Sequence, residues 1–244
     1  MGARMATKIV EEIQRTPLSR ERILRTAVEL ADVGGIEAAT MRGIAQELDV
    51  VPMALYRHVA NKDELLDGMV DRVVAEIDPP ETDVDWKQAM RRRILSARRM
   101  LQRHPWAARV MESRTDPTPA VIGYIDEMIG LFLAGGFSIE LTHHALHSMG
   151  SRLLGFTQEL FDETPPEADP ETEAAMYEAM SQAFPNIGRM IAIVMHDDSS
   201  RVGDRGCDDQ FEFEFALDLM LDGLERLKDR EDRSTARSKG MTTS

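Results

Sequence analysis

The stretch from Thr40 to Lys62, TMRGIAQELDVVPMALYRHVANK, constrains the fold of this chain more than any other. Thr40 is a residue type that caps helices, and an apolar stripe with helical spacing follows it over residues 41–48. The stripe then breaks, and Pro52 stands where the first turn of a helix tolerates a missing N–H. We therefore expect two short helices joined by a tight turn, the second over residues 53–58.

A third helix should follow, because Asn61 and Glu64 have the spacing of a capping box. Ser19 is predicted to cap the helix that precedes this stretch. A helix, a tight turn and a short helix with a polar side form the outline of a helix-turn-helix, whose second helix enters the major groove of DNA. A helical hairpin inside another all-helical protein is the alternative. That alternative leaves unexplained why Tyr56, Arg57 and Lys62 lie together on a small helix and its exit.

The residues T-x-R-x-I-A-x-x-L-x-V from Thr40 and L-Y-x-H-V-x-N-K-x-x-L-L from Leu55 resemble the DNA-binding domain of the tetracycline-repressor (TetR) family. The resemblance covers most of the chain, and the run GGFSIELTHHALHSMGSRLLGFTQE from Gly135 is similar to the tetracycline repressor subgroup. This resemblance implies an all-α protein. A three-helix DNA-binding domain would precede a larger helical domain that binds a ligand and dimerises.

The composition agrees with an all-α fold, since aromatic residues make up 5% of the chain and Met, Leu and Ala are frequent. We expect a DNA-binding domain over residues 18–78 and a regulatory and dimerisation domain over residues 79–230. Residues 1–17 form an extension that is either a frayed tail or a basic arm beside the DNA. A disordered tail is expected over residues 231–244.

The formal net charge of −14 at pH 7 argues against a nucleic-acid partner. The acidity is uneven, however: residues 1–62 hold 9 Lys and Arg against 8 Asp and Glu, so the excess of acidic residues lies in the remainder. A near-neutral DNA-facing part must contact phosphates through a small basic surface. We therefore expect DNA binding to depend strongly on salt.

Side-chain chemistry and position in the motif predict roles in DNA binding. The hydroxyls of Thr40 and Tyr56 and the ammonium of Lys62 suit phosphate oxygens. We expect Arg57 to read a base, because its guanidinium group matches O6 and N7 of guanine. The other candidates are Arg42, which could reach a base or a phosphate; Pro52, Met53 and Ala54 on the exposed side of the second helix; and His58, either a phosphate donor or a packed histidine. Leu55 and Val59 are expected to face inward.

Arg93 lies on the apolar stripe of a helix expected over residues 85–104. The other arginines of this helix are expected on a solvated face: Arg91, Arg92, Arg98, Arg99 and Arg103. A buried charge needs a partner, which could be an acidic side chain or a polar or anionic ligand. Where the tetracycline repressor subgroup carries its metal-binding His, this chain reads MESRTD over residues 111–116, so neither tetracycline nor magnesium is carried over. We expect no cofactor and a different, amphipathic effector. The ligand-binding candidates are Arg93, Ala97, His104, Met111 and Glu159.

His143 and His147 have metal-ligand spacing on a helix, but without a third ligand we interpret them as packed or interface histidines. Cys207 is the single cysteine, which excludes an intrachain disulfide. The sequence shows no signal segment and no membrane span, and a cytoplasmic location is expected.

The last helix, expected over residues 210–228, is apolar nearly all round. With the helix expected over residues 138–161 and the copies of both, it would form a four-helix dimer interface. We therefore expect a homodimeric transcriptional repressor that binds a palindromic double-stranded operator and is released by a small-molecule effector. The alternatives are a helical interaction module without DNA binding and, with no motif in support, a helical enzyme using His104, His143 or Glu159.

Overall fold

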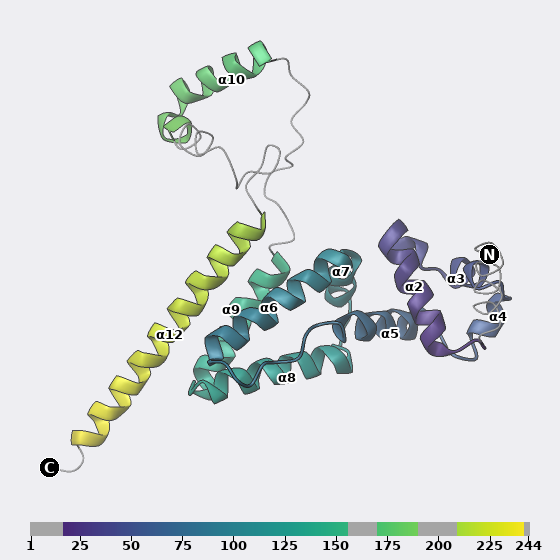
Figure 1. Cartoon of the computed structure of the whole chain (residues 1–244), viewed down its shortest axis with the longest axis horizontal. Coiled ribbons are helices and arrows are strands. Elements are labelled where there is room, and N and C mark those ends of the chain that lie inside the picture. The colour runs from purple at the N-terminus through teal and green to yellow at the C-terminus, as the bar shows by residue number, and fades with distance from the viewer. Residues whose placement is uncertain (1–16, 156–169, 190–208, 242–244) are drawn as a thin grey trace, which may run out of the picture. The chain divides into compact units, whose positions relative to one another are not determined.

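The computed structural model describes residues 17–155, 170–189 and 209–241, and the regular structure in these ranges is helical, as the sequence predicts (Figure 1). The chain divides into two compact units, one up to Leu146 and one from His147 onward. Within the described ranges, no helix has both the length and the apolar character needed to cross a bilayer. The domain boundary near residue 79 stays a prediction, and the extension predicted over residues 1–17 lies, up to residue 16, outside the described residues.

The first unit begins with helix α2 (Arg20–Gly34), the short 3-10 helix η1 (Ile36–Ala38) and helix α3 (Met41–Glu47). Ser19 Oγ accepts the N–H of Arg22, and Thr40 Oγ1 accepts the N–H of Gly43, so both predicted caps are confirmed. Gly35 ends α2 with a φ of 75°, a left-handed conformation that glycine adopts without steric cost.

Helix α4 (Pro52–Leu55) is shorter than the predicted helix over residues 53–58. The N–H groups of His58 and Val59 both donate to the carbonyl of Leu55, at 2.9 and 3.0 Å, and close a turn after the helix. Leu55 and Val59 are both fully buried, so the chain turns inward to bury them. Arg57 therefore lies on this turn and not on the helix.

Helix α5 (Lys62–Val74) is capped by Asn61, whose Oδ1 accepts the N–H of Glu64 at 2.8 Å. The carboxylate of Glu64 accepts the N–H of Ala60 at 2.7 Å, so the capping box closes one residue earlier than its usual form. This helix follows the helix-turn-helix directly and contacts each of the next three helices along the chain.

Helices α2 and α5 meet at Gly68. A Cβ at this position would lie 2.7 and 2.9 Å from the methyl carbons of Leu24. Because Leu24 is itself buried, its side chain has little room to move away. Gly68 therefore allows the close approach that joins α5 to the first helix of the DNA-binding unit.

We expect Gly68→Leu to lower the free energy of unfolding by about 1–3 kcal/mol, because overpacking a buried contact forces side chains and backbone to shift. Gly123→Ala is the matched control: Gly123 also lies within a helix, and an added Cβ would meet nothing within 4 Å. The control should gain about 0.4–1 kcal/mol. Urea unfolding followed by circular dichroism measures both, and equal effects would contradict the close-packing argument.

The rest of the first unit contains α6 (Trp86–Arg103), α7 (Trp106–Glu112), α8 (Pro119–Ala134) and the start of α9 (Ile139–Gly155). Asp85 caps α6 by accepting two backbone N–H groups at 3.0 Å. Helices α6 and α8 pack against each other, and the rings of Trp86, Phe132 and Phe137 meet at one end of the pair. Arg98, which the sequence placed on a solvated face, is 4% exposed, so that prediction is wrong.

The described part of the second unit contains α10 (Pro170–Ala183) and α12 (Asp209–Met241), a helix of 33 residues. Helix α12 continues to Met241, which corrects the disordered tail predicted from residue 231. Its C-terminal half is rich in Lys, Arg, Glu and Asp, and most of these favour helices even without apolar packing. The helix predicted over residues 138–161 corresponds to α9, and its predicted end at residue 161 lies outside the described residues.

Candidate DNA-binding and effector sites

The candidate DNA-contacting residues lie on α3, on α4, in the turns beside them and, for Lys62, at the start of α5. Leu55 and Val59 are fully buried, as predicted, and anchor the short helix and its turn. The exposed fractions of Met53 and Tyr56 are 71% and 46%. The other candidates are exposed (Thr40, Arg42, Pro52, Arg57 and Lys62) or half-buried (Ala54 and His58). Their contacts with DNA stay a prediction.

The local electrostatics leave this surface less negative than its sequence indicates. Lys62 begins α5 and is followed by two acidic residues in the first turn, Asp63 and Glu64. Glu64 forms an ion pair with Arg20 at 3.6 Å, and Asp63 one with Arg114 at 2.8 Å. Because both carboxylates are engaged by cations, they repel a phosphate near Lys62 less than free carboxylates would.

No pattern in the sequence singled out Arg114, which follows α7. Its Nη1 lies 2.8 Å from Asp63 Oδ1, and its Nε lies 2.8 Å from Asp67 Oδ1. The hydrogen bond to Asp63 raises the pKa of Arg114 above its ordinary value. The N–H of Ala120 donates to Asp71 Oδ1 at 3.1 Å. Three carboxylates spaced four residues apart on α5 therefore receive donors from the end of α7 and the start of α8.

Arg93 is buried, and its guanidinium group connects three parts of the first unit. Nη1 donates to the carbonyls of Ile77 and Asp78, just after α5, while Nη2 forms an ion pair with Glu127 on α8. The guanidinium carbon lies 4.9 Å from the centroid of the Tyr124 ring. The acidic partner expected for a buried Arg93 is confirmed, and its contact with a ligand stays a prediction.

Two buried donors in this cluster have no acceptor within the described part of the chain: the Nε of Arg93 and the hydroxyl of Tyr124. Burial raises the pKa of Tyr124 to about 12, so the hydroxyl stays protonated and can donate. An unsatisfied buried donor costs about 1–3 kcal/mol. An oxygen acceptor bound between α6 and α8 would remove that cost.

The other ligand-binding candidates are not all in one place. Ala97 lies on α6, one turn after Arg93, and is 2% exposed, while Met111 on α7 is half-buried. His104 is buried with both ring nitrogens close to carboxylates, and Glu159 lies outside the described residues. Across the described ranges, no group of three or more His, Cys, Asp or Glu is placed to hold a metal ion.

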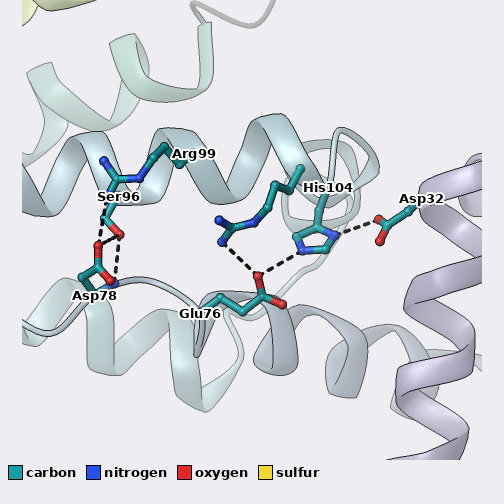
Figure 2. Close-up of polar contacts among 7 residues, drawn as sticks. Asp32, Glu76, Asp78, Ser96, Arg99 and His104 are labelled. Carbon is teal, nitrogen blue, oxygen red and sulfur yellow. Dashed lines mark hydrogen bonds and ion pairs between the residues drawn. The ribbon is translucent and has the colours of Figure 1, made fainter.

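Figure 2 shows how α6 binds the segment that follows α5. Ser96 Oγ accepts the N–H of Asp78 at 2.9 Å and donates to its Oδ2 at 2.7 Å, and Arg99 Nη2 lies 2.8 Å from the same oxygen. The Ser96 hydrogen bond, aided by Arg99, lowers the pKa of Asp78. Arg103 Nη2 donates to Glu76 Oε2 at 2.9 Å. The exit of α5 is thus held by several side chains of one helix.

Comparison with known proteins identifies the family of this chain. Residues 23–69 match the bacterial regulatory proteins of the tetR family, and residues 78–227 match the tetracyclin repressor-like C-terminal domain. The chain belongs to the TetR family. The resemblance seen in the motif from Thr40 is confirmed, and the family consists of DNA-binding regulators, not enzymes.

Two curated relatives and one solved structure illustrate the similarity. The HTH-type transcriptional repressor DrrR1 of Streptomyces coeruleorubidus is 28% identical over 86% of this chain and 78% of its own. The tetracycline repressor protein class C of Escherichia coli is 28% identical over 86% and 92%. ActR of Streptomyces coelicolor in complex with actinorhodin is 26% identical, covers 87% and 99%, and gives a TM-score of 0.66. This TetR-family chain is a ligand-responsive, DNA-binding transcriptional repressor.

Proposed function

We propose that this protein binds a palindromic operator as a homodimer in the cytoplasm and that a small molecule releases it. Each subunit would place α4 and the turn after it in one major groove, with half-sites about 34–36 Å apart or a multiple of this distance. The observation that most supports this proposal is the division of α4 and its turn into buried and exposed side chains. Leu55 at the end of α4 and Val59 after it are buried and anchor a segment whose Met53, Tyr56 and Arg57 are exposed.

The homodimer is supported by the two faces of α12. Four residues on one face are buried: Phe213, Leu217, Leu221 and Leu224. The opposite face exposes large apolar side chains, with exposed fractions of 54% for Phe215 and 57% for Leu219. A two-fold axis that pairs this face with its copy would bury these side chains and give the dimer the symmetry of a palindromic operator.

The effector site is supported by the cluster around Arg93. Its own Nε and the hydroxyl of Tyr124 are buried donors without an acceptor among the described residues, and its Nη1 binds the carbonyls just after α5. A molecule that supplies an acceptor there would compete with the present contacts of Arg93 and alter the exit of α5. ActR, a relative solved with actinorhodin, is consistent with a small-molecule effector for this chain too.

The test is selection of DNA by the purified full-length protein from genomic fragments and a random duplex pool. We expect enrichment of a two-fold symmetric sequence. Failure to enrich any sequence would contradict the proposal and favour the helical interaction module that does not bind DNA.

With the selected operator, Tyr56→Ala and Lys62→Ala should weaken binding at all sequences, because both side chains are assigned to phosphates. Lys62→Ala should also reduce the slope of log affinity against log salt by about 1. Arg57→Ala should cost about 1–3 kcal/mol and relax the preference at one base pair of each half-site.

Fluorescence anisotropy across a salt series and a set of single-base operator variants measures these effects. Arg92→Ala is the control, because Arg92 is an exposed cation on α6 that pairs with Glu81. Equal losses for Arg92→Ala and Arg57→Ala would contradict the assignment.

A further inference from the structure

We propose that His104 is a positioning residue for operator binding, which joins the end of α6 directly to α2 of the DNA-binding unit. Along the chain, α6 reaches that unit only through α5 and the segment after it. Figure 2 shows a second connection: His104, the C-cap of α6, lies between Asp32 on α2 and Glu76 just after α5. The inference rests on the proposed operator binding and adds a connection that bypasses α5.

The contacts of the His104 ring are close, and neighbouring donors support them. Nδ1 lies 2.7 Å from Asp32 Oδ1, and Nε2 lies 3.3 Å from Glu76 Oε2. Trp106 Nε1, from the start of α7, donates to the same Asp32 oxygen at 2.7 Å, and Arg103 Nη2 donates to the same Glu76 oxygen at 2.9 Å. The side chain of His104 is 8% exposed, so water screens these interactions little.

Asp32 is unusual in its own helix. It lies in the last turn of α2, where the carbonyl end of the helix disfavours a negative charge, and this turn has no basic residue. Helix α2 therefore gives this carboxylate little stabilisation, and its hydrogen bonds come from His104 and Trp106. A carboxylate held in this way transmits a shift of the α6–α7 junction to α2.

The pairing also sets a charge requirement. Both ring nitrogens of His104 face carboxylate oxygens, so both must carry hydrogen to donate, and only the imidazolium form does so. The charged groups that face the ring are Asp32 from α2, Glu76 after α5 and Arg103 from α6. Histidine commonly changes charge between pH 5 and 8. A neutral ring has a single N–H donor, so it would keep only one of the two connections.

The movement of α2 would reach the DNA-binding surface through packed contacts. Helix α2 crosses α5 at Gly68 and also contacts α3. A change in the orientation of α2 therefore changes the orientation of α3, α4 and the turn that carries Arg57. The two subunits of the dimer must enter two major grooves at a fixed spacing. A small rotation of α4 in either subunit would therefore lower operator affinity.

The experiment compares operator affinity of the full-length protein between pH 5.5 and 8.5, at constant ionic strength, for the wild type and His104→Gln. His58→Gln alone is measured alongside, because His58 is a candidate phosphate contact and its own contribution to the profile must be known. We expect the wild type, which is the reference for both variants, to lose about tenfold in affinity as pH rises, close to the net contribution of one hydrogen bond to a charged group. His104→Gln should have the weaker affinity at every pH and a flat profile.

Asp32→Asn is the second variant, at a partly exposed side chain, and should reproduce the flat profile even if His104→Gln fails to fold. A purely structural role would lower stability but leave the slope against pH unchanged. If either folded variant keeps the affinity and pH profile of the reference while Arg57→Ala loses binding, this inference is overturned and the proposed function stands. If the wild type binds no operator at any pH, the proposed function fails, and the inference fails with it.

Discussion

Phe215→Glu combined with Leu219→Glu is expected to abolish operator binding at concentrations where the wild type is saturated. Both side chains lie on the exposed apolar face of α12 and are more than half exposed. Burying two unpaired carboxylates from each subunit, four in the dimer, in the proposed interface would cost several kcal/mol. A monomer contacts one half-site and loses the gain from linking two sites, which is about 10²–10⁴ in affinity.

Light scattering with size-exclusion chromatography measures the oligomeric state, and fluorescence anisotropy measures operator affinity. The matched control is the exchange Phe215→Leu with Leu219→Phe, which keeps the face apolar and its volume nearly constant and should preserve the dimer. If the double glutamate variant remains a dimer with wild-type affinity, this face of α12 is not the interface. If it becomes a monomer and still binds the operator tightly, the two-fold account of DNA binding is wrong.

Phe132→Ala should produce the largest loss of folding stability, about 3–5 kcal/mol, because it removes a large buried side chain and leaves a cavity. Phe132 is fully buried, with its ring centroid 5.0 Å from that of Phe137 and 6.0 Å from that of Trp86. Trp86 also lies directly on Gly135, where an added Cβ would be 2.6 Å from the indole. These close contacts limit how far the cluster can collapse into the cavity.

Urea unfolding followed by tryptophan fluorescence measures this loss, since Trp86 is one of the two tryptophans and lies in the cluster. Leu133→Ala is the control, because Leu133 is the next residue of α8 and is 43% exposed. We expect its effect to be within about 1 kcal/mol. Similar losses for the two variants would show that the aromatic cluster is not the centre of this core.

Local interactions were predictable from the sequence. The caps at Ser19, Thr40 and Asn61 were identified from residue type and spacing, and each forms the expected hydrogen bond. A cap depends on a side chain and an N–H two or three residues away, so the information lies within one short stretch. The all-α fold and the family followed from such local patterns.

Where predictions from local patterns were wrong, the packing of helices determined the structure. Helix α4 ends at Leu55 because burial of Leu55 and Val59 turns the chain inward, although the next residues permit a helix. Arg98 was expected in solvent from its place in an arginine-rich run, yet the packing of α6 buries it. Helix propensity and charge runs do not include these tertiary contacts.

By itself, the sequence determined that Arg93 is buried and needs a partner, that α4 is anchored by Leu55, and that the motif from Thr40 belongs to a DNA-binding unit. Only the tertiary structure decided the partners: Glu127 for Arg93, Asp63 for Arg114, and Asp32 for His104, which is 72 residues away in the chain. Secondary structure and burial depend on periodicity within one helix. A polar contact between distant residues depends on how whole helices pack, and many acidic side chains in this chain have equivalent chemistry.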